Sequence, residues 1–136
     1  MAVNVDFILT ADHATVDANG KLNLLGLFNR ISAQSFPAIH GKFFFVVQFC
    51  IPINERGTEK QVGIKLLGPD GETIFGWNHT LAVPHEFDKL EMGQPLMIEL
   101  SQLVLPVSGE YAWKVEINNE TRASLTWHIE LLGEKQ

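Results

Sequence analysis

The stretch that decides the fold is residues 110–131, EYAWKVEINNETRASLTWHIEL. It holds two runs in which every second residue is apolar, separated by the polar tetrapeptide NNET. The apolar positions are Tyr111, Trp113, Val115 and Ile117, then Ala123, Leu125, Trp127, Ile129 and Leu131. A period of two is typical of a β-strand with one face in a core and the other in water. The stretch therefore predicts an antiparallel hairpin with its turn at NNET.

Similar runs recur along the chain, separated by turn residues such as GPDG at 68–71. They cover residues 3–9, 21–31, 42–52, 60–77 (two strands around GPDG) and 95–105. In the first run, Val3, Val5, Phe7 and Leu9 are predicted to share one face. About eight strands with no long helix predict an all-β fold, an antiparallel β-sandwich that is immunoglobulin-like or a related Greek key. A length of 136 residues fits a single sandwich domain over residues 1–136.

Composition limits the classes of partner. The net charge is −6, and the ten basic residues are scattered along the sequence, so neither nucleic acid nor an anionic membrane is an expected partner. Cys50 is the single cysteine, which excludes an intrachain disulfide, and the N-terminal residues lack a signal-peptide pattern. We expect a cytoplasmic protein.

The segment DHATVDANG (residues 12–20) is the densest in candidate chemistry. Asp12 and His13 would suit a metal-dependent enzyme, but adjacent strand residues point to opposite faces. The segment also fails as a calcium-binding EF-hand loop, because its first and twelfth positions hold threonine and glycine. Asn19 and Gly20 tolerate the positive φ of a tight hairpin, and Asp17 can accept backbone hydrogen bonds there. We therefore predict a turn.

Two runs are apolar on both faces, although a sandwich strand usually exposes one. In residues 42–52 the second face carries Phe44, Val46, Gln48 and Cys50; in residues 21–31 it carries Leu25, Leu27 and Ile31. Something should cover these side chains. The candidate interface residues are Phe44, Val46, Gln48, Leu25 and Leu27.

The connection LAVPHEFDKLEMGQP, residues 81–95, offers an alternative to a partner. It lacks a strand pattern and could contain one helical turn around residues 87–90. If it folded over the second apolar face, Phe87, Leu90 and Met92 would be the covering side chains. The protein could then be a monomer.

Few other residues point to chemistry. Cys50 lies in the most apolar run, where burial raises a thiol's pKa and makes it inert. No nucleophile elbow, phosphate-binding loop or paired metal-ligand motif is present, and no cofactor is expected. Trp77 is the one tryptophan that could be exposed, and so the candidate contact for a glycan or small ligand. Tyr111, two residues after Gly109, resembles a tyrosine corner, whose hydroxyl bonds back to the backbone.

The segment ADHATVDANGKLNLLGLFNRISAQSFPAIHGKFFFVVQF (residues 11–49) resembles a family of small uncharacterised bacterial proteins. GPDG and SGEYAWKVEIN also look like the rest of such proteins, so the resemblance covers nearly the whole chain. In that family an aspartate directly precedes the alanine of the Ala-Thr-Val-Asp segment, whereas this sequence carries His13 between the two. The resemblance implies a β-sandwich and no assigned activity.

Together these observations favour a non-enzymatic protein-interaction or assembly module that acts through an apolar sheet face, with self-association into a homo-oligomer as its most economical form. Two alternatives stay open. One is a glycan or small-ligand module near Trp77, and the other is a metal-dependent enzyme using Asp12 and His13.

Overall fold

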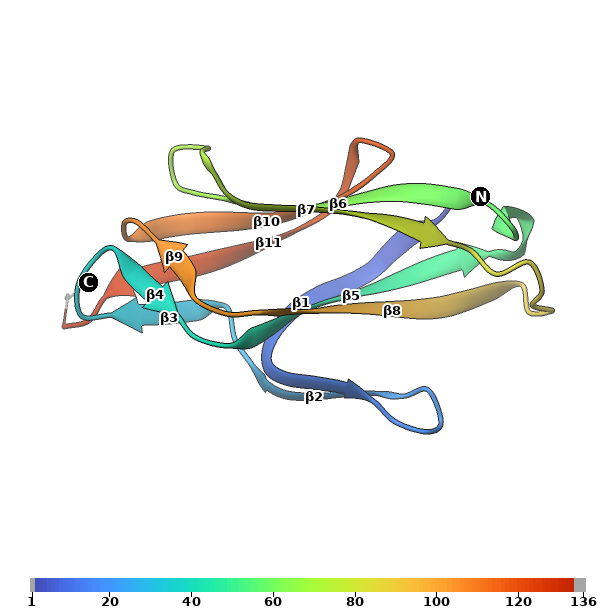
Figure 1. Ribbon diagram of the computed structural model, residues 1–136, viewed down its shortest axis with the longest axis horizontal. Helices are drawn as coiled ribbons and strands as arrows, with labels where there is room; N and C mark the ends of the chain where they lie inside the picture. Colours follow the sequence, from blue (N-terminus) through green and yellow to red (C-terminus); the bar gives the residue numbers. More distant parts are fainter. Residues whose placement is uncertain (1, 134–136) are drawn as a thin grey trace.

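The computed structural model describes residues 2–133, which fold into an all-β sandwich with two main layers (Figure 1). One sheet has the order β2-β1-β5-β8, and the second has the order β3-β11-β10-β6-β7. A small sheet pairs β4 with β9 at one end. The strands are β1 (Asn4–Val16), β2 (Leu22–Leu27), β3 (Arg30–Ala33), β4 (Ala38–His40), β5 (Phe43–Pro52), β6 (Glu59–Leu67), β7 (Thr73–Ala82), β8 (Glu91–Leu100), β9 (Leu103–Leu105), β10 (Gly109–Ile117) and β11 (Glu120–Leu131).

All pairings are antiparallel except that of β3 with β11, which is parallel, so the second sheet is mixed. A single 3-10 turn, Ile53–Glu55, follows β5. Within residues 2–133 no helix has the length and apolar character required to cross a bilayer. Residue 1 and residues 134–136 of the expected domain lie outside the described residues.

Residues 2–133 hold eleven strands where the sequence predicts about eight. Two expected strands are each divided. The run at 21–31 ends as β2 at Leu27, and the chain then crosses to the other sheet to form β3. The run at 95–105 is divided at Gln102, whose φ of +56° ends β8 and separates it from β9. The remaining additional strand is β4, which is three residues long and so too short to show a period.

The β10–β11 hairpin confirms the prediction made from residues 110–131. Asn118 and Asn119 form its turn with φ of +50° and +68°, a conformation that asparagine tolerates better than most residues. Every second residue of β10, from Tyr111 to Ile117, is buried. The Tyr111 hydroxyl donates to the Val107 carbonyl at 2.6 Å and accepts from the Val107 amide at 3.2 Å, as in a tyrosine corner.

β1 differs from its predicted alternation because it contains a β-bulge. Val5 pairs with Phe49, whereas Phe7 pairs with Gln48, so Asp6 is an extra residue in the strand. The bulge exchanges the two faces of the strand after Asp6. Val3 and Ile8 are buried in the core, while Phe7 is 38% exposed. The prediction that Phe7 and Leu9 share a face with Val3 and Val5 is therefore wrong.

The core lies between the two main sheets and is rich in aromatic rings. Phe43 and Trp127 lie 5.2 Å apart between ring centroids, and Phe28 and His40 each pack on both of them. His40 is half-buried, and burial lowers the pKa of its imidazole, with a smaller opposing effect from the charge of Asp12. The imidazole therefore favours the neutral form inside this cluster.

Thr10 is a buried polar residue of the core, at 1% exposure. Its hydroxyl accepts a hydrogen bond from Trp127 Nε1 at 3.0 Å and donates one to the Phe28 carbonyl at 2.6 Å. The backbone amide of Phe28 in turn donates to the Thr10 carbonyl at 3.0 Å. Thr10 thus joins β1 to β11 in the opposite layer and to the crossing between β2 and β3.

We predict that Thr10→Val lowers the free energy of unfolding by about 2–4 kcal/mol, because two buried polar groups lose their partner. Thr10→Ser keeps the hydroxyl and loses only a methyl group, at a cost of about 1 kcal/mol. Urea unfolding followed by tryptophan fluorescence measures both. Equal losses for the two variants would contradict a role for the hydrogen bonds.

We also predict that stability declines as the pH falls below the ordinary His40 pKa of 6.5. The folded pKa is lower than the unfolded one, so the unfolded chain binds the proton more tightly. The contribution of neutral His40 to the free energy of unfolding is therefore complete above pH 6.5 and is lost as the pH falls toward the folded pKa. The melting temperatures of the wild type and of His40→Gln, measured from pH 7.5 to 5.5, should converge as the pH falls. Parallel curves would contradict this prediction.

Candidate interface on the outward sheet face

The outward face of the β2-β1-β5-β8 sheet carries a continuous apolar surface. Phe43, Phe45, Val47 and Phe49 of β5 are buried in the core, so the alternate residues of this strand point outward. The strand register shows which residues of β1, β2 and β8 lie beside these outward residues of β5. Three rows cross the sheet: Leu27, Ala11, Phe44 and Glu99; then Leu9, Val46 and Met97; then Phe7, Gln48 and Pro95. Leu25 lies beyond the first row, opposite His13.

The structure thus brings all five predicted interface residues onto one face. Leu25 and Leu27 are 67% and 58% exposed, Phe44 and Gln48 are half-buried, and Val46 is fully covered by its neighbours. Sequence reasoning missed Phe7 and Leu9, which reach this face only because of the bulge at Asp6. The apolar residues of the three rows and Leu25 are called the outward patch below.

β2 presents the most exposed part of the outward patch. It forms a hairpin with the far half of β1 that extends away from the two layers (Figure 1). Gly26, between the two exposed leucines, has a φ of +73°, and a Cβ there would lie 2.4 Å from Asp12 Oδ2. The positive φ favours glycine at this position, and a larger residue would also require the exposed Asp12 side chain to move.

Polar groups lie at two margins of the outward patch. Lys42 Nζ is 3.6 Å from Glu99 Oε1, with both side chains more than half exposed, and it also lies 5.7 Å from the Phe44 ring centroid. The Gln48 amide packs against Gly93 of β8, where a Cβ would lie only 2.3 Å from Nε2. Gln48 Oε1 is buried without a hydrogen-bond partner among the described residues.

The connection at 81–95 does not cover the outward patch. Leu81 and Val83 are buried in the main core, and Phe87 and Met92 pack against that core as well. Leu90 is 83% exposed. The structure has an irregular segment at 83–90 in place of the expected helical turn, and β8 begins at Glu91. The alternative in which Phe87, Leu90 and Met92 act as the cover is therefore wrong.

Asp12 and His13 both lie exposed in the β1–β2 hairpin. Among residues 2–133 no group of three or more His, Cys, Asp or Glu side chains is arranged to hold a metal ion. Asp17 Oδ1 accepts hydrogen bonds from the amides of Asn19 at 2.9 Å and Lys21 at 3.0 Å, and these bonds lower the pKa of its carboxyl group. Gly20 has a φ of +79°. The predicted turn is confirmed.

Cys50 and Trp77 lie at different margins of the sandwich. The Cys50 thiol donates to Glu91 Oε2 at 3.3 Å, and its pKa is raised by burial and then by Glu91, as expected for an unreactive thiol. Trp77 of β7 pairs with core residue Ile64 and stacks on His79, with ring centroids 5.2 Å apart. It is half-buried and packs against the core, so it offers a ligand less surface than an exposed tryptophan would.

Comparison with known proteins agrees with this architecture. The model of a family described as "Family of unknown function (DUF6941)" matches residues 6–130. A solved structure of an immunoglobulin-like protein from Pseudomonas aeruginosa is similar over 95% of this chain and 97% of its own, with 13% identity and a TM-score of 0.51. No curated protein matches the chain. The immunoglobulin-like sandwich predicted from the sequence is thus confirmed at the level of the fold.

Proposed function

The chain belongs to the family of unknown function DUF6941, and we propose that it is a non-enzymatic protein-interaction module that self-associates through the outward patch. The observation that carries the proposal is the exposure of Leu25 and Leu27 next to Phe44, Val46 and Leu9 on one face. A contiguous exposed apolar surface on a soluble fold is typical of an interface. Its apolar centre and charged margin are also typical of one.

A second copy of the chain is the simplest partner. In a two-fold dimer one patch meets the same patch on its partner, so no other complementary surface is needed. The Lys42–Glu99 pair lies at the margin, where both charges could stay hydrated. Val46 and Ala11 are fully buried, so the centre of the patch is closely packed.

The rest of the proposal follows from composition. The net charge of −6 favours neither nucleic acid nor an anionic membrane as the partner. A single free cysteine is compatible with a reducing compartment, and the cytoplasm of a bacterium is the location that we propose. The immunoglobulin-like fold and the absence of a metal-holding cluster in residues 2–133 support a binding role over catalysis.

We predict that the wild type forms dimers with a concentration dependence measurable by light scattering or sedimentation, and that Leu27→Asp raises the dimer dissociation constant tenfold or more. The reason is that a buried, unpaired carboxylate at an apolar interface is costly. Val46 is a poor site for this test because it is fully buried in the monomer, where a charge would disturb folding.

The matched control is Ile39→Asp. Ile39 of β4 is 69% exposed, against 58% for Leu27, and lies outside the outward patch. The Ile39→Asp variant should leave the dimer unchanged, and circular dichroism should show that both variants are folded. A wild type that stays at 15.2 kDa across the whole concentration range would overturn self-association. An equal effect of the two variants would show that the dimer uses another surface.

A further inference from the structure

Each main sheet has two free edges, and β7 is the least protected of the four. β7 is ten residues long and contains no proline, lysine, arginine or carboxylate side chain. β8, the free edge of the other sheet, has Pro95 in its middle and Glu91 and Glu99 near its ends. Proline and charged residues on an edge strand prevent it from pairing with another chain. β7 lacks both of these devices.

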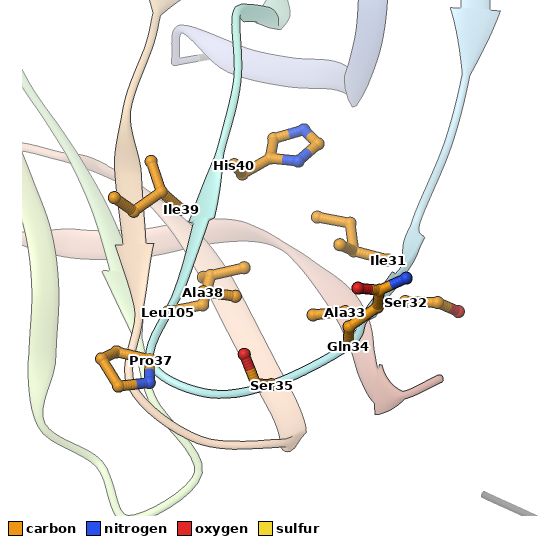
Figure 2. A pocket seen from close by; sticks show the side chains of 10 residues that line it. All are labelled: Ile31, Ser32, Ala33, Gln34, Ser35, Pro37, Ala38, Ile39, His40 and Leu105. Atoms are coloured by element: carbon orange, nitrogen blue, oxygen red, sulfur yellow. The ribbon is translucent and has the colours of Figure 1, made fainter. Parts of the chain in front are cut away.

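The other two edges, β2 and β3, are shorter. β2 has six residues and is interrupted by the positive φ of Gly26, and β3 has four residues. A hollow of about 470 Å³ lies between β3 and β4, and Figure 2 shows that the side chains of Ile31 and His40 point into it. The space beside β3 is therefore lined by side chains. β7 offers the longest edge that neither proline nor positive φ interrupts.

Hydrogen bonds on the two sides of β6 show which backbone groups of β7 are free. The Val83 amide donates to the Thr58 carbonyl at 2.9 Å, and on the other side of β6 the Asn118 amide donates to the Gln61 carbonyl at 2.7 Å. Consecutive residues of a strand direct their backbone groups to opposite edges. Even-numbered residues from 58 to 66 therefore bond to β7, and the register pairs them with odd-numbered residues from 75 to 83.

The backbone groups of four residues of β7 consequently point away from β6. These residues are Gly76, Asn78, Thr80 and Ala82. All four are exposed, and no segment of residues 2–133 outside the sheet bonds to their backbone. A Cβ at Gly76 would meet only the Thr73 methyl group, at 4.0 Å. Each of the four thus offers one donor and one acceptor to an added strand.

β7 and β8 end the two layers on the same side of the sandwich. The Thr10–Trp127 hydrogen bond places β1 over β11, and ring packing places β5 over β10, so the remaining strands of each sheet follow in the same direction. On that side Phe75, Trp77 and Ile98 are half-buried and pack against the core. A strand added beside β7 would place every second side chain over these residues, so apolar side chains are favoured at those positions.

Acidic residues flank β7 at both ends. Asp70 and Glu72 precede it, Glu86 and Asp88 follow it, and all four are exposed. Arg56 lies with Glu86 and Asp88 around one hollow and offsets part of their charge. A second copy of β7, paired antiparallel with the first, would bring the acidic start of one strand toward the acidic end of the other. A segment with basic residues at its ends is complementary instead.

We propose that β7 binds an extended segment of a partner protein, which adds a sixth strand to the five-stranded sheet through the free groups of residues 76–82. The bound segment is about seven residues long, apolar at alternate positions and basic at its ends. Main-chain hydrogen bonds supply the affinity, and the alternate side chains supply the specificity. β7 shares no residue with the outward patch, so this proposal is independent of self-association.

The probe is the capped octapeptide acetyl-Lys-Thr-Val-Thr-Val-Thr-Val-Lys-amide, titrated into the ¹⁵N-labelled full chain. The control peptide carries N-methyl groups on all its internal amides, so neither of its edges can form a ladder. With the first peptide we expect saturable shifts and slower hydrogen exchange at the amides of residues 76, 78, 80 and 82. The control should bind at least tenfold more weakly. Equal responses to both peptides, or no response to either at the solubility limit, would overturn the proposal.

A third peptide, with glutamate in place of both lysines, tests the charged ends. It should bind at least threefold more weakly than the lysine peptide at low ionic strength, and the difference should shrink as salt is added. Equal binding of the two would overturn the assignment of basic ends. Without peptide, the four edge amides should exchange faster than those of residues 75, 77, 79 and 81. Slow exchange that is lost on dilution would show a second copy at the edge and overturn the assignment to a partner protein.

Two matched variants test the location. Asn78→Pro removes a free edge amide while leaving the β6 side intact, and proline is tolerated on edge strands. Asn78→Ala changes the same side chain but keeps the amide, so it should keep the peptide response that the proline variant loses. Thr80→Pro provides the test if Asn78→Pro fails to fold. Leu27→Asp on the outward patch should also keep the response, whatever its effect on the dimer. Retained binding in a folded proline variant would overturn the assignment to β7.

Discussion

The hydrogen bonds of the Thr10 hydroxyl fix how the two layers of the sandwich meet. Thr10 must face inward to reach Trp127 and Phe28, yet Val5 near the start of β1, like Val3 just before it, also faces the core. Val5 and Thr10 are five positions apart, and residues an odd number of positions apart point to opposite faces of a regular strand. The bulge at Asp6 resolves this conflict, and it is also what turns Phe7 and Leu9 outward. The outward patch is therefore a consequence of how the core is closed.

Those parts of the fold that depend on local patterns could be predicted from the sequence. The β10–β11 hairpin, the Asp17 turn and the Tyr111 corner each depend on residues close together in the chain. The bulge in β1 and the crossing after Leu27 could not be predicted, because both depend on partners far away. At Leu27 the apolar pattern continues without interruption while the chain moves from one layer to the other, since Phe28 and Ile31 stay in contact with the core.

The candidate site shows the same division. Alternation within residues 42–52 was enough to identify Phe44, Val46 and Gln48 as a second face, because β5 is regular and its core face is clear. Leu25 and Leu27 extend this face only because β1 pairs with both β2 and β5. The short strand β4 had no signal in the sequence, since a strand of three residues shows no reliable period.

The parallel pairing of β3 with β11 has a consequence for the order of folding. Residues 30–33 can find their partner only after residues 128–131 have been synthesised, although β2, immediately before them, can pair at once with β1. Contacts between such distant segments form late and slowly. During synthesis, a ribosome-bound chain would therefore hold the N-terminal hairpin with residues 30–33 still free, and the second sheet would gain its edge strand in the last steps of assembly.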